Sequence, residues 1–255
     1  MSAIESRDEG GILVIELDRP PVNALDVETL DALSDALEGA EEADAIILTG
    51  AGSAFSAGAD LRKVLEANAA EVDAGIVALQ RCFETLFVYP RPLIAAVNGY
   101  ALAGGAVITC TADRRIASED AGLIGAVELK AGVPFPAWAL EIVRHAVNNS
   151  HVEEVIYFGR SYSPADALRK GLVDEVVPAA DLMAKATKRA RELANVPRET
   201  FRLTKHSLRR WTTEAARRGM AETDEQVKAT WSLPEVHDAI RRLLSSLGDS
   251  PGRDV

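Results

Sequence analysis

The chain has 255 residues, 47% of them hydrophobic, and a formal net charge of −11, which is enough for one large domain or a domain with an appendage. This acidity argues against general nucleic-acid binding, because a phosphate backbone would be repelled before specific contacts formed. No apolar stretch approaches the roughly eighteen residues of a membrane helix, and the polar start does not resemble a signal sequence, so we expect a cytoplasmic protein that does not bind membranes.

The first half of the chain alternates between expected strands and expected helices. Apolar runs that end at proline or glycine predict strands at 11–17, 45–49 and 93–97. The spacing of apolar residues predicts helices at 27–39, which Gly39 caps, at 73–88 and at 104–112. Because strands that alternate with helices form right-handed crossovers, we expect the α/β class with a mostly parallel sheet.

The second half is increasingly helical. Ser163 and Pro164 predict a helix start and Gly171 its end, before an apolar segment at 172–177. From residue 179 onward the pattern is helical, and one stripe of the last helix is apolar: Val236, Ile240, Leu243, Leu244 and Leu247. We expect a core at 1–196, a C-terminal helical region at 197–247 and a disordered tail at 248–255.

Cysteine and histidine do not indicate a metal site. The two cysteines, Cys82 and Cys110, lie in apolar contexts, and neither they nor the four histidines have metal-ligand spacing. We therefore expect buried thiols and no bound metal.

Two segments of small residues, at 56–61 and 98–106, each follow an apolar run and each precede an expected helix. Free backbone amides concentrate at helix starts, and small residues let a ligand oxygen approach them closely. If the fold brings the two segments together, they form an oxyanion hole.

Four segments in register resemble the crotonase superfamily, also called the enoyl-CoA hydratase/isomerase family. They are 21–25, 55–61, 95–105 and 159–173. The resemblance covers nearly the whole chain and implies a spiral of repeated β-β-α units with a C-terminal helical region that packs trimers, often as dimers of trimers. It also implies an acyl-CoA substrate, with coenzyme A carried by the substrate and no further cofactor required.

Carried over residue by residue, the resemblance implies that the backbone amides of Ala59 and Gly104 bind the thioester carbonyl. The α-proton of a thioester becomes acidic enough to remove only when charge on this oxygen is stabilised. One such donor is typically worth roughly a hundredfold to a thousandfold in rate.

The resemblance places the coenzyme A moiety beside the first of these turns. The implied lining residues of the adenine pocket are Ala57, Gly58, Asp60 and Leu61. Arg62 suits contact with the phosphates, with Arg19 and Lys63 as weaker candidates. Each basic side chain is equally well explained as solvated surface, and Asp60 is better explained as a helix N-cap.

One of the two glutamates of a hydratase is missing. Glu128, four residues before Gly132, matches one of them, whereas Val107 occupies the place of the other. A hydratase of this type holds its water between two carboxylates, and acid–base assistance is worth roughly a hundredfold to ten-thousandfold. A lone Glu128 can still move a proton from C2 of a 3-enoyl-CoA to C4, so Δ3,Δ2-isomerisation is the leading hypothesis.

Two other functions stay open at this point. Hydration survives if Glu66 or Glu71 supplies the missing carboxylate, and a non-catalytic acyl-CoA binder could keep the pocket without the chemistry. The segment 133–136, with Trp138, either reshapes the acyl pocket or forms a rigid turn into a helix. For Glu128 the plain alternative is an exposed loop carboxylate, although its apolar neighbours would raise its pKa if it is buried.

Overall fold

A six-stranded sheet forms the frame of the protein in the computed structural model, which describes residues 3–248. In spatial order its strands are β1 (Ile4–Asp8), β2 (Ile12–Leu17), β3 (Ala45–Gly50), β5 (Leu93–Val97), β7 (Arg114–Ser118) and β9 (Glu175–Val177). β1 pairs antiparallel with β2, and every other neighbouring pair in this sheet is parallel. The α/β class with a mostly parallel sheet is confirmed.

A second, three-stranded parallel sheet consists of β4 (Ala54–Ser56), β6 (Tyr100–Leu102) and β8 (Ile124–Gly125). Each of these strands follows a strand of the first sheet: β3 leads to β4, β5 to β6 and β7 to β8. Each then leads to a helical segment: α2 (Leu61–Glu66), α4 (Gly104–Thr111) or the 3₁₀ turn η1 (Glu128–Ala131). This is the expected spiral of β-β-α units.

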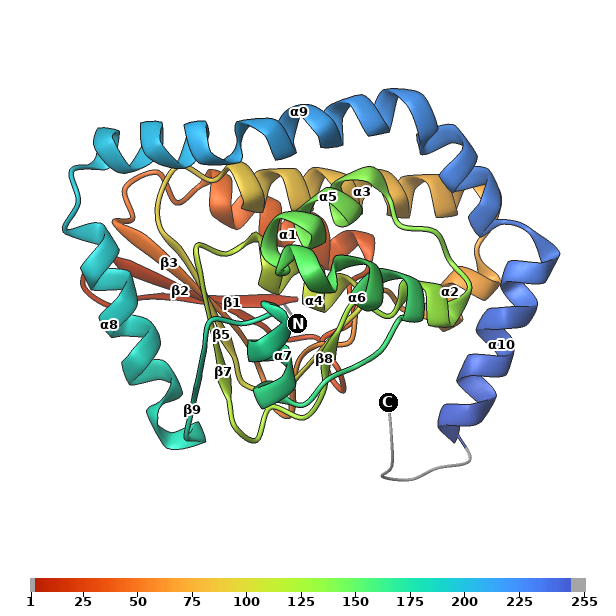
Figure 1. Cartoon of the computed structure of the whole chain (residues 1–255), viewed down its shortest axis with the longest axis horizontal. Coiled ribbons are helices and arrows are strands. Elements are labelled where there is room, and N and C mark those ends of the chain that lie inside the picture. The colour runs from red at the N-terminus through yellow and green to blue at the C-terminus, as the bar shows by residue number, and fades with distance from the viewer. Residues whose placement is uncertain (1–2, 249–255) are drawn as a thin grey trace.

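Helices cover both faces of the large sheet. One face packs against α1 (Val27–Glu38), α3 (Ala69–Val88) and α5 (Ala137–Ala146), and the other packs against α8 (Leu182–Ala194), which flanks the sheet in Figure 1. Because side chains alternate along a strand, Ile46 joins the first cluster and Ile47 joins the α8 cluster. A strand buried on both faces is a continuous apolar run, as in β3.

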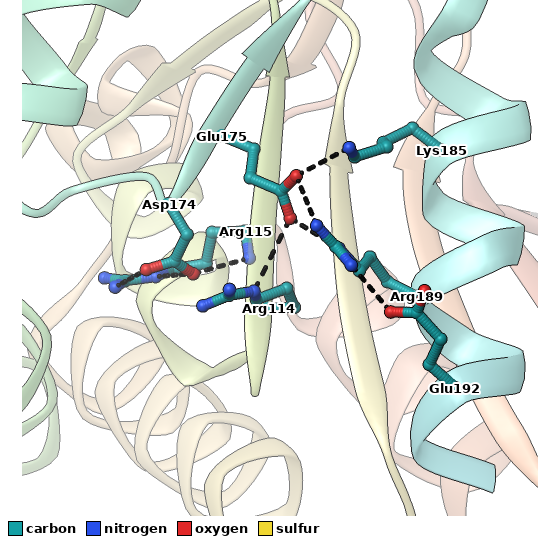
Figure 2. A network of polar contacts seen from close by, with 7 residues as sticks. All are labelled: Arg114, Arg115, Asp174, Glu175, Lys185, Arg189 and Glu192. Carbon is teal, nitrogen blue, oxygen red and sulfur yellow. Dashed lines mark hydrogen bonds and ion pairs between the residues drawn. The ribbon is translucent and has the colours of Figure 1, made fainter. Parts of the chain in front are cut away.

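Ion pairs attach the edge strand β9 to its neighbours (Figure 2). The Glu175 carboxylate lies 2.7 Å from Nε of Arg189 and 2.9 Å from Nζ of Lys185, both on α8. The hydrogen bond from Arg189 is the largest reason why the pKa of Glu175 falls to about 2. Beside it, Arg115 of β7 pairs with Asp174 at 2.6 Å.

The C-terminal part consists of α9 (Arg198–Trp231) and α10 (Pro234–Gly248). α9 packs along α5 and α3, and α10 turns back to contact α2 and η1 (Figure 1). Val236 and Ile240 of the expected apolar stripe are buried. Gly248, expected to begin a disordered tail, is the last residue of α10, and 249–255 lie outside the described residues.

Within residues 3–248, no helix combines the length and apolarity needed to cross a membrane.

Local capping explains where several helices begin and end. Gly39 is the C-cap of α1, and Ser163 caps α7 (Pro164–Lys170), which ends at Gly171 with φ of 86°. The helix expected at 73–88 begins earlier, at Ala69, because Asn68 and Glu71 form a capping box. The remaining helical segments are α6 (Val152–Phe158), η2 (Asn149–His151) and η3 (Ala179–Asp181).

The two cysteines are buried and unpaired, as expected. Burial raises the pKa of Cys82 to about 12 and that of Cys110 to about 11, which keeps both as neutral thiols.

Candidate active site

The three strands of the small sheet bring the candidate residues to one edge. β4 ends three residues before Ala59, β6 ends two residues before Gly104, and β8 ends three residues before Glu128. The strands are parallel neighbours, so their carboxyl ends meet at the same edge, where ligands of parallel sheets commonly bind. Three segments far apart in the sequence therefore converge.

The two small-residue turns are in direct contact. A Cβ atom on Gly58 would lie 2.9 Å from the backbone nitrogen of Gly104, so only glycine fits here. Leu25 contacts both turns: it forms a β-bridge with Ala59, and its Cδ1 would lie 2.9 Å from a Cβ atom on Gly104. The fold thus places the Ala59 and Gly104 turns side by side, as the sequence led us to expect.

The backbone amides of Ala59 and Gly104 donate to no carbonyl in the turns, loops and helix caps of the described chain. Gly104 is the first residue of α4, where an amide has no partner inside the helix. Ala103 before it has φ of 47°, an unusual value for alanine, and its own amide donates to the Gly125 carbonyl at 2.9 Å. Such backbone strain persists where surrounding contacts fix the chain, and it is common at functional sites.

Glu128 is the first residue of η1 and is buried, with 6% of its surface exposed. Its Oε2 has no hydrogen-bond partner, and no basic side chain within residues 3–248 forms an ion pair with it. Burial raises its pKa to about 8, and a hydrogen bond to its own backbone opposes this shift. A carboxyl group whose pKa lies near neutral pH is suited to taking and returning a proton at physiological pH.

Val107 lies one turn into α4 and is fully buried. The position at which a hydratase would carry its other glutamate is therefore occupied by an apolar side chain packed in the core. Glu128 is left without a carboxylate partner from α4.

A cavity of about 550 Å³ lies beside the Ala59 turn. Its lining comes from the start of α1, from α2 and its flanking loops, from the first half of α3 and from Trp231. Ala59 is part of this lining, whereas Gly104 and Glu128 are not. The residues that follow Glu128, Ala131 and Val133, pack in one cluster with Trp231 and with apolar side chains of α3. The loop that follows Glu128 thus packs against residues that line the cavity.

The residues expected around the adenine pocket form a hydrogen-bonded turn. Ala57 donates its amide to the Val22 carbonyl at 3.0 Å, and Gly58 donates its amide to Oγ of Ser56 at 3.1 Å. Asp60 is the N-cap of α2, which begins at Leu61. The N-cap interpretation of Asp60 is confirmed.

The three basic candidates have different surroundings. Asp26 binds two of them, Arg19 at 2.6 Å and Lys63 at 2.8 Å, and Arg19 also pairs with Glu28 at 3.1 Å. The Arg62 side chain is exposed and has no ion pair among the described residues. Arg62 is therefore the candidate whose charge is uncompensated.

Glu66 and Glu71, the possible substitutes for the missing carboxylate, both line the cavity and are both exposed. Glu71 already accepts a hydrogen bond from the Asn68 amide at 2.8 Å, as part of the α3 capping box. Glu66 is the freer of the two.

Trp138 is not among the residues that line this cavity, and its suggested effect on the acyl pocket stays a prediction. It is fully buried and packs edge-on against Phe87, with ring centroids 6.1 Å apart. The tryptophan that does line the cavity is Trp231, which no motif singled out. Its only sequence signal is its place in the apolar pattern of a C-terminal helix.

Comparison with known proteins identifies the family of this chain. Residues 7–242 match the family model of enoyl-CoA hydratase/isomerase. The chain belongs to the enoyl-CoA hydratase/isomerase family.

Family relatives carry both activity names. The mitochondrial enoyl-CoA delta isomerase 1 of Rattus norvegicus is 32% identical over 83% of this chain and 75% of its own length. A putative enoyl-CoA hydratase of Thermus thermophilus is 35% identical over 79% of this chain and 81% of its own length. The human mitochondrial delta3-delta2-enoyl-CoA isomerase structure superposes with a TM-score of 0.91 at 26% identity, covering 98% of this chain and 100% of that one. Membership of the enoyl-CoA hydratase/isomerase family thus leaves the choice of reaction to the residues of the site.

Proposed function

We propose that this protein is an enoyl-CoA isomerase that converts 3-enoyl-CoA thioesters into 2-enoyl-CoA thioesters. The observation that carries the proposal is the buried carboxylate of Glu128, at the edge of the small sheet where the amides of Ala59 and Gly104 also lie. Val107, a buried residue of α4, stands where a water-adding enzyme of this type would carry its other carboxylate. The isomerase names of the rat and human relatives support the same choice.

In the proposed reaction the thioester oxygen accepts hydrogen bonds from the amides of Ala59 and Gly104. Ionised Glu128 takes the proton from C2, and the C–H electrons move into a dienolate whose negative charge rests on the thioester oxygen. As the carbonyl re-forms, the double bond settles between C2 and C3, and C4 receives the proton from Glu128. The proton returns to the substrate, so no water or other reactant is consumed. The two amides lower the barrier because they stabilise charge that exists mainly in the transition state.

The coenzyme A moiety is proposed to lie across the turn at 57–61, with its phosphates near Arg62. Arg19 and Lys63 reach the phosphates only when they leave Asp26. Assembly into trimers or dimers of trimers, a cytoplasmic location and the division into a core at 1–196 and a helical region at 197–247 stay predictions.

The test of the isomerase is Glu128→Gln, which keeps the size of the side chain and removes its ability to accept a proton. We expect turnover of a 3-enoyl-CoA to fall by at least a hundredfold, while calorimetric binding of a saturated acyl-CoA persists. Glu141→Gln, a change on α5, is the matched control and should leave turnover unchanged. Unchanged turnover in Glu128→Gln would refute the assignment.

Hydration is the second candidate, favoured by the position of Glu66 on the cavity wall. It predicts rapid loss of the conjugated thioester absorbance of crotonyl-CoA, dependent on both Glu128 and Glu66. The isomerase hypothesis predicts slow loss that Glu66→Gln does not change. Tight binding without turnover of either substrate would support a non-catalytic binder instead.

A further inference from the structure

Trp231 reaches the cavity from a distant part of the chain. It is the last residue of α9, and the other cavity-lining residues lie between Arg19 and Leu79. Although it lines the cavity, only 5% of its surface is exposed. Most of the ring is therefore packed against protein, and one part faces the empty space.

The ring is held in place from several sides. Its Nε1 donates to the Pro134 carbonyl at 3.3 Å, in the loop that follows the Glu128 turn. It packs in a cluster with Val72 and Ile76 of α3 and with Val236 and Ile240 of α10. Because the chain reverses directly after Trp231 and α10 then contacts α2 and η1, the ring cannot swing away unless α10 moves too.

The cavity lining combines charged and apolar residues. Charged residues line the cavity at the start of α1, along α2 and at the start of α3: Arg19, Asp26, Glu28, Asp60, Lys63, Glu66 and Glu71. Trp231 instead clusters with the apolar residues of α3 and of the loop after Glu128. Ala59 belongs to the same lining. A thioester held at Ala59 thus has polar lining at the start of α1 and along α2, and an apolar surface at Trp231 that suits an acyl tail.

We infer that Trp231 is the end wall for the acyl tail and limits this enzyme to short acyl chains. The inference rests on the proposed acyl-CoA function and deepens it. A rigid, pinned indole stops a growing chain, whereas a smaller side chain leaves room for further methylene groups. Each buried methylene is worth about fourfold in affinity, so three more correspond to about sixtyfold.

The test compares Trp231→Ala and Trp231→Phe with Trp211→Ala. Trp211 is on the same helix but is 69% exposed and lies outside the cavity, so it controls for loss of an indole. Dissociation constants are measured by calorimetry for saturated acyl-CoAs with four to twelve acyl carbons, and kcat/KM is measured for the matching 3-enoyl-CoAs. Circular dichroism checks the fold of each variant.

We expect the affinity of the unaltered protein to peak at a short chain. In Trp231→Ala the peak moves to a chain about three carbons longer, with affinity for the longer ester increased about sixtyfold, and Trp231→Phe lies between the two. Trp211→Ala keeps the original peak. If Trp231→Ala fails to fold, the direction of the shift in Trp231→Phe decides the question.

An unchanged chain-length peak in the Trp231 variants that fold would overturn the inference. Binding of saturated esters does not require isomerisation, so a protein that binds them but turns over no 3-enoyl-CoA refutes the proposed reaction and leaves the end-wall test intact. A protein that binds no acyl-CoA of any length overturns both.

Discussion

At the scale of single residues, the proposed role of Glu128 depends on what surrounds it. A carboxylate in water has a pKa near 4.5, and burial without a basic neighbour raises that of Glu128 to about 8. The protonated form is therefore favoured in the empty site at neutral pH. Only the ionised form can take the C2 proton. The proposed activity therefore depends on the ionisation of Glu128 near pH 8, whereas an exposed glutamate is already ionised above acidic pH.

This titration predicts the pH dependence of isomerisation. We expect kcat/KM for a 3-enoyl-CoA to rise about tenfold per pH unit below pH 8 and to level off above it, because the fraction of ionised Glu128 in the free enzyme follows this course. The measurement is a kcat/KM profile from pH 5.5 to 9.5. A profile that is already flat at pH 6 would contradict the prediction.

Asp26 is the residue that limits positive charge at the cavity. Burial alone would raise its pKa, but hydrogen bonds from Lys63 and from Thr29 outweigh this effect and lower it to about 2. The carboxylate is thus charged at any working pH and holds both Arg19 and Lys63. Its Oδ1 meanwhile accepts the Thr29 amide at 3.0 Å as the N-cap of α1.

Asp26→Asn separates these two roles, since asparagine caps helices as well as aspartate does. We expect α1 and the melting temperature to be preserved and the affinity for coenzyme A esters to increase about two- to fivefold, because Lys63 becomes available to phosphate and Arg19 keeps only its pair with Glu28. The affinity should also depend more steeply on salt concentration. Calorimetric titrations at two ionic strengths measure both effects, and Asp35→Asn, which alters an exposed pair with Arg81, is the control. Weaker binding in Asp26→Asn would show that the ion pairs organise the site rather than compete with the ligand.

At the scale of elements, Asp113 attaches the long helix α9 to the sheet. Its carboxylate accepts the backbone amide of Leu93 in β5 at 2.8 Å and pairs with Lys205 at 2.7 Å and with Arg209 at 2.8 Å, both on α9. Both basic groups are buried, and burial lowers the pKa of Lys205 to about 8 even though Asp113 opposes the shift. One carboxylate thus compensates two buried cations.

Asp113→Ala should destabilise the protein by about 3–5 kcal/mol, because it leaves these cations buried without their partner. Asp238→Ala, which breaks an exposed pair with Arg241 on α10, should cost less than about 1 kcal/mol. Urea unfolding of the two variants measures the difference. Equal midpoints would mean that α9 is held by apolar packing alone.

The long elements were predictable from the sequence and the short ones were not. A continuous apolar run at 45–48 identifies β3, and apolar residues at helical spacing over several turns identify α1. β6 has three residues and β8 has two, too few for any period to be visible. Their existence depends on pairing with β4 and with each other, which is tertiary information.

At the scale of the whole molecule, the site is a product of topology. The sequence indicated the Ala59 and Gly104 turns through their local pattern of small residues, and the lone Glu128 through the family resemblance. It could not indicate that Asp26 neutralises two basic candidates or that Trp231 lines the cavity, since both depend on contacts between distant segments. Trp231 in particular arrives only because α9 and α10 fold back over the spiral (Figure 1).

Successive coils of the spiral each deliver one ingredient of the proposed reaction: the first two supply the hydrogen-bond donors, and the third supplies the proton carrier. Hydrogen bonding to the thioester carbonyl and proton transfer are therefore proposed to depend on separate segments of the chain. Substitutions in the third coil can change which product forms from the activated thioester, while the first two coils still stabilise the charge on its carbonyl oxygen.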